Sequence, residues 1–172
     1  MLTPYHGRCW KLPDGVSSDQ LIAPPHVFNF EPDYLRQHLL AEVSPDLARS
    51  AKPGDIIVAG AHFAHGSVHS HPFIAMKAMG LGLICRSLSR GPYRLTVFMG
   101  VPVLTIDDET YCAIRDADEL AVDFATGEIR TTDKTFKAEP LPPFLMEIIE
   151  AGGGFEYAKQ QSARSSSHAG SG

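Results

Sequence analysis

The sequence is poor in the residues that mark several common classes of protein. Only three cysteines occur in 172 residues, Cys9, Cys85 and Cys112, and no two of them form a C-x-x-C pair. An odd number of widely spaced cysteines excludes a disulfide framework and a closed four-thiolate metal site within one chain. We therefore expect buried free thiols, which pack as small apolar residues.

Long apolar runs and clusters of positive charge are also missing. No stretch approaches the roughly 20 apolar residues of a membrane span, and the N-terminus lacks the apolar core of a signal peptide. The net charge is −5 at pH 7, and lysines and arginines are scattered singly, which argues against a nucleic-acid surface. These absences predict a soluble cytoplasmic protein that binds neither membranes nor nucleic acid.

What is present suits one globular domain with a parallel α/β unit. Apolar strands are predicted at 55–60, 83–85 and 101–106, with helices over 72–79 and 93–99 between them. Strands that alternate with helices form a parallel sheet. Functional loops of such a sheet lie at the carboxyl ends of its strands.

The segments on either side complete a single-domain prediction for residues 1–161. A short strand is expected at 8–12, and helical spacing of apolar residues covers 31–42. After the parallel unit come a hairpin, 119–123 with 128–131, and a helix over 144–150. The Ser/Gly-rich tail, residues 162–172, is predicted to be disordered.

Four of the eight histidines, His62, His65, His69 and His71, surround the pair Gly66-Ser67 after the first of these apolar strands. Imidazoles bind metals, move protons near neutral pH and pair with carboxylates. One interpretation is therefore a stand-alone metal-dependent lyase or hydrolase built on this cluster. Another is an anion-binding loop in which Ser67 and His69 face a ligand beside a helix start. For His62, a structural or exposed position is favoured.

Several segments together resemble one family over about residues 7 to 160, in matching order and spacing. The segments are Asp14-Gly-Val-Ser-Ser-Asp-Gln-Leu-Ile-Ala-Pro24, Lys52-Pro-Gly-Asp-Ile-Ile-Val-Ala-Gly60, Phe63-x-x-Gly66-Ser67, Ser87-x-x-Arg90, Gly100-Val101-Pro102 and Ile149-Glu-Ala-Gly-Gly153. The family that they resemble is the small subunit of 3-isopropylmalate dehydratase.

The resemblance implies an α/β fold, the aconitase-like swivelling β/β/α domain with a parallel or mixed central sheet. It implies a hydro-lyase that dehydrates and rehydrates a hydroxy di- or tricarboxylate related to isopropylmalate. It also implies a large partner subunit that carries a [4Fe-4S] cluster, with no cofactor bound by this chain alone. A homo-oligomer is left open.

The signature loop of the family reads Gly-Ser-Ser-Arg-Glu-His, which matches Gly66 to His71 here. The first serine, which as an alkoxide takes the substrate proton, is Ser67. The second serine is replaced by Val68, the carboxylate-gripping arginine by His69 and the glutamate by Ser70. A histidine lacks the always-charged fork of arginine and holds a carboxylate when protonated.

These departures lie in the active loop, whereas the framework matches. They predict a dehydratase scaffold turned to a different substrate, or a catalytically silent binding module on the same fold. We expect Ser67 to be catalytic and no residue to bind a metal. The expected substrate-binding residues are His65, Val68, His69, His71, Arg90, Asp19 and Gln20.

Overall fold

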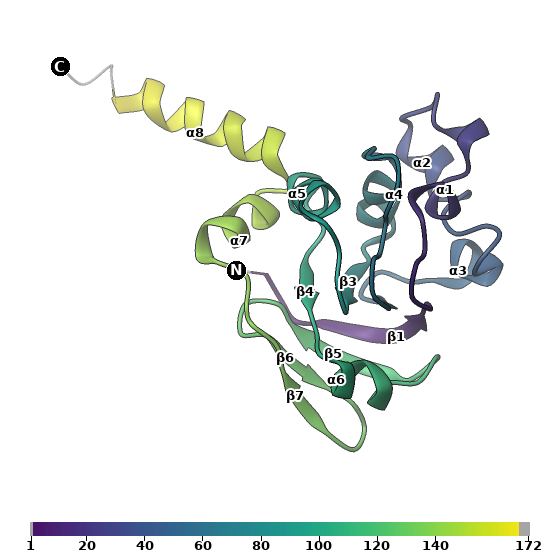
Figure 1. Ribbon diagram of the computed structural model, residues 1–172. Coiled ribbons are helices and arrows are strands. Elements are labelled where there is room, and N and C mark those ends of the chain that lie inside the picture. The colour runs from purple at the N-terminus through teal and green to yellow at the C-terminus, as the bar shows by residue number, and fades with distance from the viewer. Residues whose placement is uncertain (1, 169–172) are drawn as a thin grey trace.

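The structure is a computed structural model that describes residues 2–168. A mixed sheet of seven strands, in the order β4-β3-β2-β1-β5-β6-β7, forms its centre (Figure 1). The strands are β1 (Tyr5–Lys11), β2 (Ile56–Ala59), β3 (Gly82–Cys85), β4 (Val103–Thr105), β5 (Glu119–Asp123), β6 (Glu128–Arg130) and β7 (Thr135–Lys137).

The sheet has a parallel half and an antiparallel half that share β1. Strands β1, β2, β3 and β4 pair in parallel. On its other edge β1 pairs antiparallel with β5, which continues through β6 to β7. Every residue of β2 and β3 is buried, which explains their uninterrupted apolar sequence. The predicted parallel unit and the later hairpin are both confirmed.

Helices connect and cover the strands. Among the described residues, no helix has the length and apolar character needed to cross a membrane. The helices are α1 (Ser18–Leu21), the 3-10 helix η1 (Pro24–His26), α2 (Pro32–Leu35), α3 (Pro45–Ser50), α4 (His71–Met79), α5 (Arg90–Phe98), α6 (Asp108–Ala113), α7 (Pro143–Glu150) and α8 (Gly154–His168).

Helix α4 shows how local sequence sets an element that positions the loop before it. Pro72 lies in its first turn, where a missing N–H costs no helical hydrogen bond. Gly80 ends the helix with a φ of 68°, a left-handed conformation that glycine adopts without strain. The predicted helix over 72–79 is thus confirmed.

The helix expected over 31–42 is wrong beyond Leu35. Only α2 forms there, and turns follow it. The Leu40 backbone N–H donates to the Leu21 carbonyl at 2.8 Å, and Leu40 adopts a positive φ of 56°. This contact with α1 buries Leu39 and Leu40 completely, and such tertiary burial outweighs helix propensity.

The three cysteines are unpaired, as expected, but they are not all buried. Cys9 on β1 and Cys85 on β3 lie in the core, whereas Cys112 is exposed. Helix α6, which carries Cys112, lies at the surface and buries only Thr110. The prediction of three buried thiols is therefore wrong for Cys112.

Helix α8 projects from the body of the molecule (Figure 1). The structure continues it through His168, where the sequence predicted disorder from Ser162 onward. The hydroxyls of Ser165 and Ser166 donate to the carbonyls four residues earlier, which gives these serines partners inside a helix. Residues 169–172 of the predicted tail lie outside the described residues.

A buried carboxylate ties β1 to the turn before β2. Asp55 is only 5% exposed. One of its oxygens accepts from the Arg8 N–H at 2.9 Å. The other accepts from Trp10 Nε1 at 2.9 Å and from the Lys52 N–H at 3.0 Å. All three donors would lose their partner if this side chain were removed.

We expect Asp55→Ala to lower the free energy of unfolding by about 3 kcal/mol, because it leaves buried donors unsatisfied. Urea unfolding followed by circular dichroism measures the loss. Asp46→Ala is the matched control, since Asp46 pairs with Arg49 at the exposed surface and should matter little. Equal losses in the two variants would contradict the role given to Asp55.

Candidate functional site

Three loops lie side by side at the carboxyl ends of β1, β2 and β3. They are residues 12–17, 60–70 and 86–89, and they extend the parallel pairing of the strands that precede them. The backbone hydrogen bonds between them include Gly15 N to Ala61 O at 2.8 Å, Ala64 N to Val16 O at 2.8 Å and Phe63 N to Ser87 O at 3.0 Å, and the first residue of α1 adds Ser18 N to His65 O at 2.9 Å.

Arg86, in the third of these loops, forms a clamp to the first loop and to α6. The Arg86 guanidinium contacts Asp14 at 3.0 Å and Asp108 at 2.6 Å. Asp14 also accepts from the Ala61 N–H at 2.7 Å, and this bond is the main reason that its pKa is lowered. The clamp therefore fixes the β1 loop against the start of the β2 loop.

Loop 60–70 turns sharply before it presents Ser67. His62 and Ala64 both have a φ of 57°, and Gly66 has a φ of 96°. The buried side chains of Phe63 and Ala64 anchor the turn, so that residues 65–68 all lie exposed. Ser67, expected to be catalytic, is thus exposed at the surface of the molecule, and the buried side chains of the same turn fix its position.

The start of α5 lies against this loop. A Cβ added to Gly91 would come within 3.2 Å of Val68 Cγ2, so the valine packs directly on the first turn of the helix. Arg90, the first residue of α5, is exposed. The structure therefore gives Val68 a packing contact and brings Arg90 to the same edge of the molecule as Ser67.

The start of α1 forms the next part of this edge. Ser17 caps the helix, and the Gln20 side chain accepts from the Ser17 N–H at 2.9 Å in a reciprocal capping box. The structure thus shows a local role for Gln20. Asp19 is exposed and close enough to raise the pKa of His69. Substrate contacts of both residues stay predictions.

His69 and His71 are directly paired. Their Nδ1 atoms lie 3.1 Å apart, and the His71 ring packs against Phe30 with centroids at 4.3 Å. Burial is the main cause of a lowered pKa in both rings. The Nε2 atoms of both rings are buried without a hydrogen-bond partner. Neither ring is therefore an exposed cation in this arrangement.

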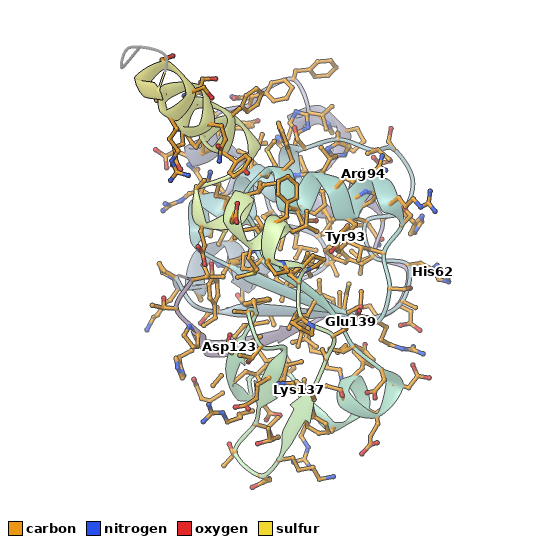
Figure 2. All side chains as sticks on the ribbon, turned by 90° about the vertical axis from the view of Figure 1, so that its left-hand side faces the viewer. His62, Tyr93, Arg94, Asp123, Lys137 and Glu139 are labelled. Carbon is orange, nitrogen blue, oxygen red and sulfur yellow. The ribbon has the colours of Figure 1, made fainter. Side chains whose placement is uncertain are left out.

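The four histidines of the predicted metal cluster do not converge. His62 lies at the edge of the molecule (Figure 2), and His65 Nε2 lies 3.0 Å from the Gly15 carbonyl oxygen. Within residues 2–168, no group of three or more His, Cys, Asp or Glu side chains is placed to hold one metal ion. The structure therefore does not support the stand-alone metal site.

Sequence reasoning missed Ser18 and Phe30. Ser18 is 3% exposed, and its buried hydroxyl has no partner and faces Gly66. Its position directly before Asp19-Gln20 in the family-like segment was a usable signal. Phe30 reaches His71 from a loop far away in the sequence, and no local pattern marks such a contact.

The site is an open surface. The crevice beneath the loop, lined by Ser18, Ser67, His69 and Leu95 among others, leaves no space for a water-sized molecule. A larger hollow of about 410 Å³ lies elsewhere, between α4, α5 and the start of α8, and its lining is mainly apolar. Because that hollow holds none of the predicted site residues, we place the site on the loops.

Curated relatives match the chain over most of its length. The 3-isopropylmalate dehydratase small subunit of Wolinella succinogenes is 35% identical, over 92% of this chain and 95% of its own. That of Methanosarcina mazei is 38% identical, over 90% and 96%. The isopropylmalate/citramalate isomerase small subunit of Methanocaldococcus jannaschii is 35% identical, over 92% and 96%. No protein-family model matches the chain.

A solved structure gives the same result for the fold. The crystal structure of 3-isopropylmalate dehydratase from Methanocaldococcus jannaschii superposes with a TM-score of 0.89 at 30% sequence identity, over 96% of this chain and 99% of that chain. This match confirms the swivelling β/β/α fold that the resemblance implied. The chain belongs to the 3-isopropylmalate dehydratase small subunit family.

Proposed function

We propose that this chain is the small subunit of a heteromeric iron–sulfur hydro-lyase that acts on a hydroxy di- or tricarboxylate related to isopropylmalate. The observation that carries the proposal is the exposed Ser67, which loop 60–70 presents at the carboxyl ends of the parallel strands. Ligands of open α/β sheets bind at these ends. Arg90 supplies nitrogen donors at the same edge, and the His69 ring lies in the crevice beside Ser67.

The open surface supports a second chain in the complete site. Ser67 and Arg90 are exposed, and Val68 is 59% exposed. Dehydration needs a site that excludes bulk water around the reacting carbons. Among residues 2–168, the crevice at Ser67 leaves no space that could enclose a substrate. A large subunit that closes over the loop would supply the missing walls.

The cysteines of this chain do not fit a [4Fe-4S] cluster. Cluster ligands are thiolates. Burial raises the pKa of Cys9 and of Cys85 to about 12, so both thiols stay protonated in the core. Cys112 on α6 is the remaining cysteine, and one thiol cannot hold the cluster. We therefore place the cluster on the partner and derive no step of this chain through it.

The step that we assign to this chain is a proton transfer at Ser67 Oγ. As an alkoxide the oxygen takes a proton from a substrate carbon, the C–H electron pair forms the double bond, and the C–O bond of the neighbouring carbon breaks to release hydroxide. In rehydration hydroxide adds to the double bond and the serine returns the proton. A serine hydroxyl is a weak base unless its anionic form is stabilised, and a nearby cation does this. Arg90 is the candidate cation, and its guanidinium can also pair with a substrate carboxylate through two parallel hydrogen bonds.

Recognition differs from the family pattern at Val68 and His69. Valine removes a hydroxyl, and histidine removes the two-pronged donor of arginine. The loop therefore offers fewer fixed donors to the substrate than the family signature does. We propose a hydroxy acid whose carboxylates and side group fit this changed set.

Ser67→Ala should lower kcat in the reconstituted assembly by about a hundredfold or more, because the proton acceptor is lost. Steady-state kinetics measures the effect. Ser89→Ala is the matched control, since Ser89 is exposed at the start of α5 and makes no side-chain cap bond there. Unchanged turnover in Ser67→Ala would instead support a catalytically silent binding module.

Activity should require the partner. We expect the isolated chain to leave 3-isopropylmalate unchanged, and we expect turnover after co-expression with a large subunit that contains three cluster-binding cysteines. The ultraviolet absorbance of the unsaturated product follows the reaction. Turnover by the isolated chain, abolished by a chelator, would contradict the proposal and would support the interpretation as a stand-alone metal-dependent enzyme.

A further inference from the structure

The His69–His71 pair constrains where its protons lie. The two Nδ1 atoms are 3.1 Å apart, so one of them carries the hydrogen and the other accepts it. Each neutral imidazole has a single N–H. One ring is therefore protonated at Nδ1, and the other is protonated at Nε2.

The surroundings favour one of the two arrangements. Burial lowers the pKa of His71, and the Val27 backbone partly offsets this effect, although His71 Nε2 makes no hydrogen bond in the resting structure. No backbone group acts in this way on His69. An N–H that faces away from the pair is therefore better placed on His71. His69 then donates from Nδ1 to His71 Nδ1, and its own Nε2 carries a bare lone pair.

The crevice keeps His69 neutral at rest. Its Nε2 is buried without a partner, and the walls next to it include the apolar Phe73 of α4 and the apolar Pro92 and Leu95 of α5. Burial, followed by the neighbouring His71 of α4, lowers the pKa of His69. Asp19 of α1 opposes them. The effect of Asp19 has the sign expected of any nearby carboxylate, which raises the pKa of His69 and stabilises its imidazolium form.

We propose that His69 is a proton-coupled carboxylate clamp, which rests neutral against His71 and turns outward as an imidazolium when a substrate carboxylate binds beside Ser67. One proton from solution adds to the Nε2 lone pair, and the new N–H donates to the carboxylate. His71 is the positioning residue, because its Nδ1 holds His69 in the resting orientation. The inference rests on the proposed function only for the identity of the carboxylate.

The outward turn is compatible with the geometry of the loop. Residues 65–68 are exposed, and the His69 side chain is only half-buried. The resting pair leaves a buried nitrogen of His69 unsatisfied, so little hydrogen bonding opposes its departure. His71, at 4% exposure and packed on Phe30, stays in place. Binding through His69 should therefore weaken as pH rises, which an arginine at this position would not show.

Nitrogen-15 NMR of histidine side chains in the full chain tests the resting pair and the clamp without any turnover. We expect His69 to be neutral and protonated at Nδ1 near neutral pH. Excess 3-isopropylmalate should raise the pKa of His69 relative to chloride at equal ionic strength, while the exposed His6 on β1 reports general salt effects. The clamp would be refuted if the pKa of His69 were the same with and without 3-isopropylmalate.

Variants of His71 test its positioning role. His71→Ala should free His69, raise the pKa of His69 without ligand and shrink the shift caused by the diacid. Because His71 is buried, His71→Asn serves as the conservative variant, with an amide oxygen that can accept from His69 Nδ1 and restore the resting state. An unchanged His69 titration in folded His71→Asn and His71→Ala alike would contradict the positioning role.

Kinetics of the reconstituted complex separates the two proposals. With one proton taken up per binding event, KM should rise about tenfold per pH unit from the pKa of the free His69 up to the pKa of the bound His69, with little change in kcat. His69→Arg should flatten this dependence. Equal pH dependence in both forms would overturn the clamp. A complex without any hydro-lyase turnover would instead refute the proposed function, and the NMR titration would still decide the clamp.

Discussion

The candidate site depends on backbone hydrogen bonds that continue the parallel pairing of β1, β2 and β3 beyond the ends of the strands. Loops far apart in the sequence become neighbours because each donates to the next at 2.8 to 3.0 Å. Arg86, in the loop after β3, adds ion pairs to Asp14 of the loop after β1 and to Asp108 of α6. Ser67, Arg90 and Asp19 share one edge as a result. Asp55 also supports this arrangement, because its hydrogen bonds fix β1 against the turn that precedes β2.

Much of this framework could be predicted from the sequence. Local sequence is enough to predict β2 and β3 from their apolar runs, and α4 from Pro72 at its start and Gly80 at its end. Features set by distant contacts could not be predicted in the same way. Leu40 leaves the helical path because it bonds to Leu21.

The candidate site shows the same division. Its position at the strand ends followed from the order of the elements, but the orientation of its side chains did not. The sequence predicted that His69 takes the place of an arginine toward substrate, whereas the structure turns His69 toward His71. Phe30, which packs against His71, comes from a segment with no local mark of that role. Spacing alone also suggested a metal cluster, whereas the fold pairs His69 with His71 and directs His65 to the Gly15 carbonyl.

Our central claim is that this chain supplies half of an active site, with Ser67 facing the substrate and a partner covering it. The most direct measurement is a structure of the reconstituted complex with a bound hydroxy diacid. We expect Ser67 Oγ within about 3.5 Å of the carbon that exchanges its proton, and the partner over loop 60–70. A partner docked on the apolar hollow between α4, α5 and α8, with Ser67 left in solvent, would contradict the claim.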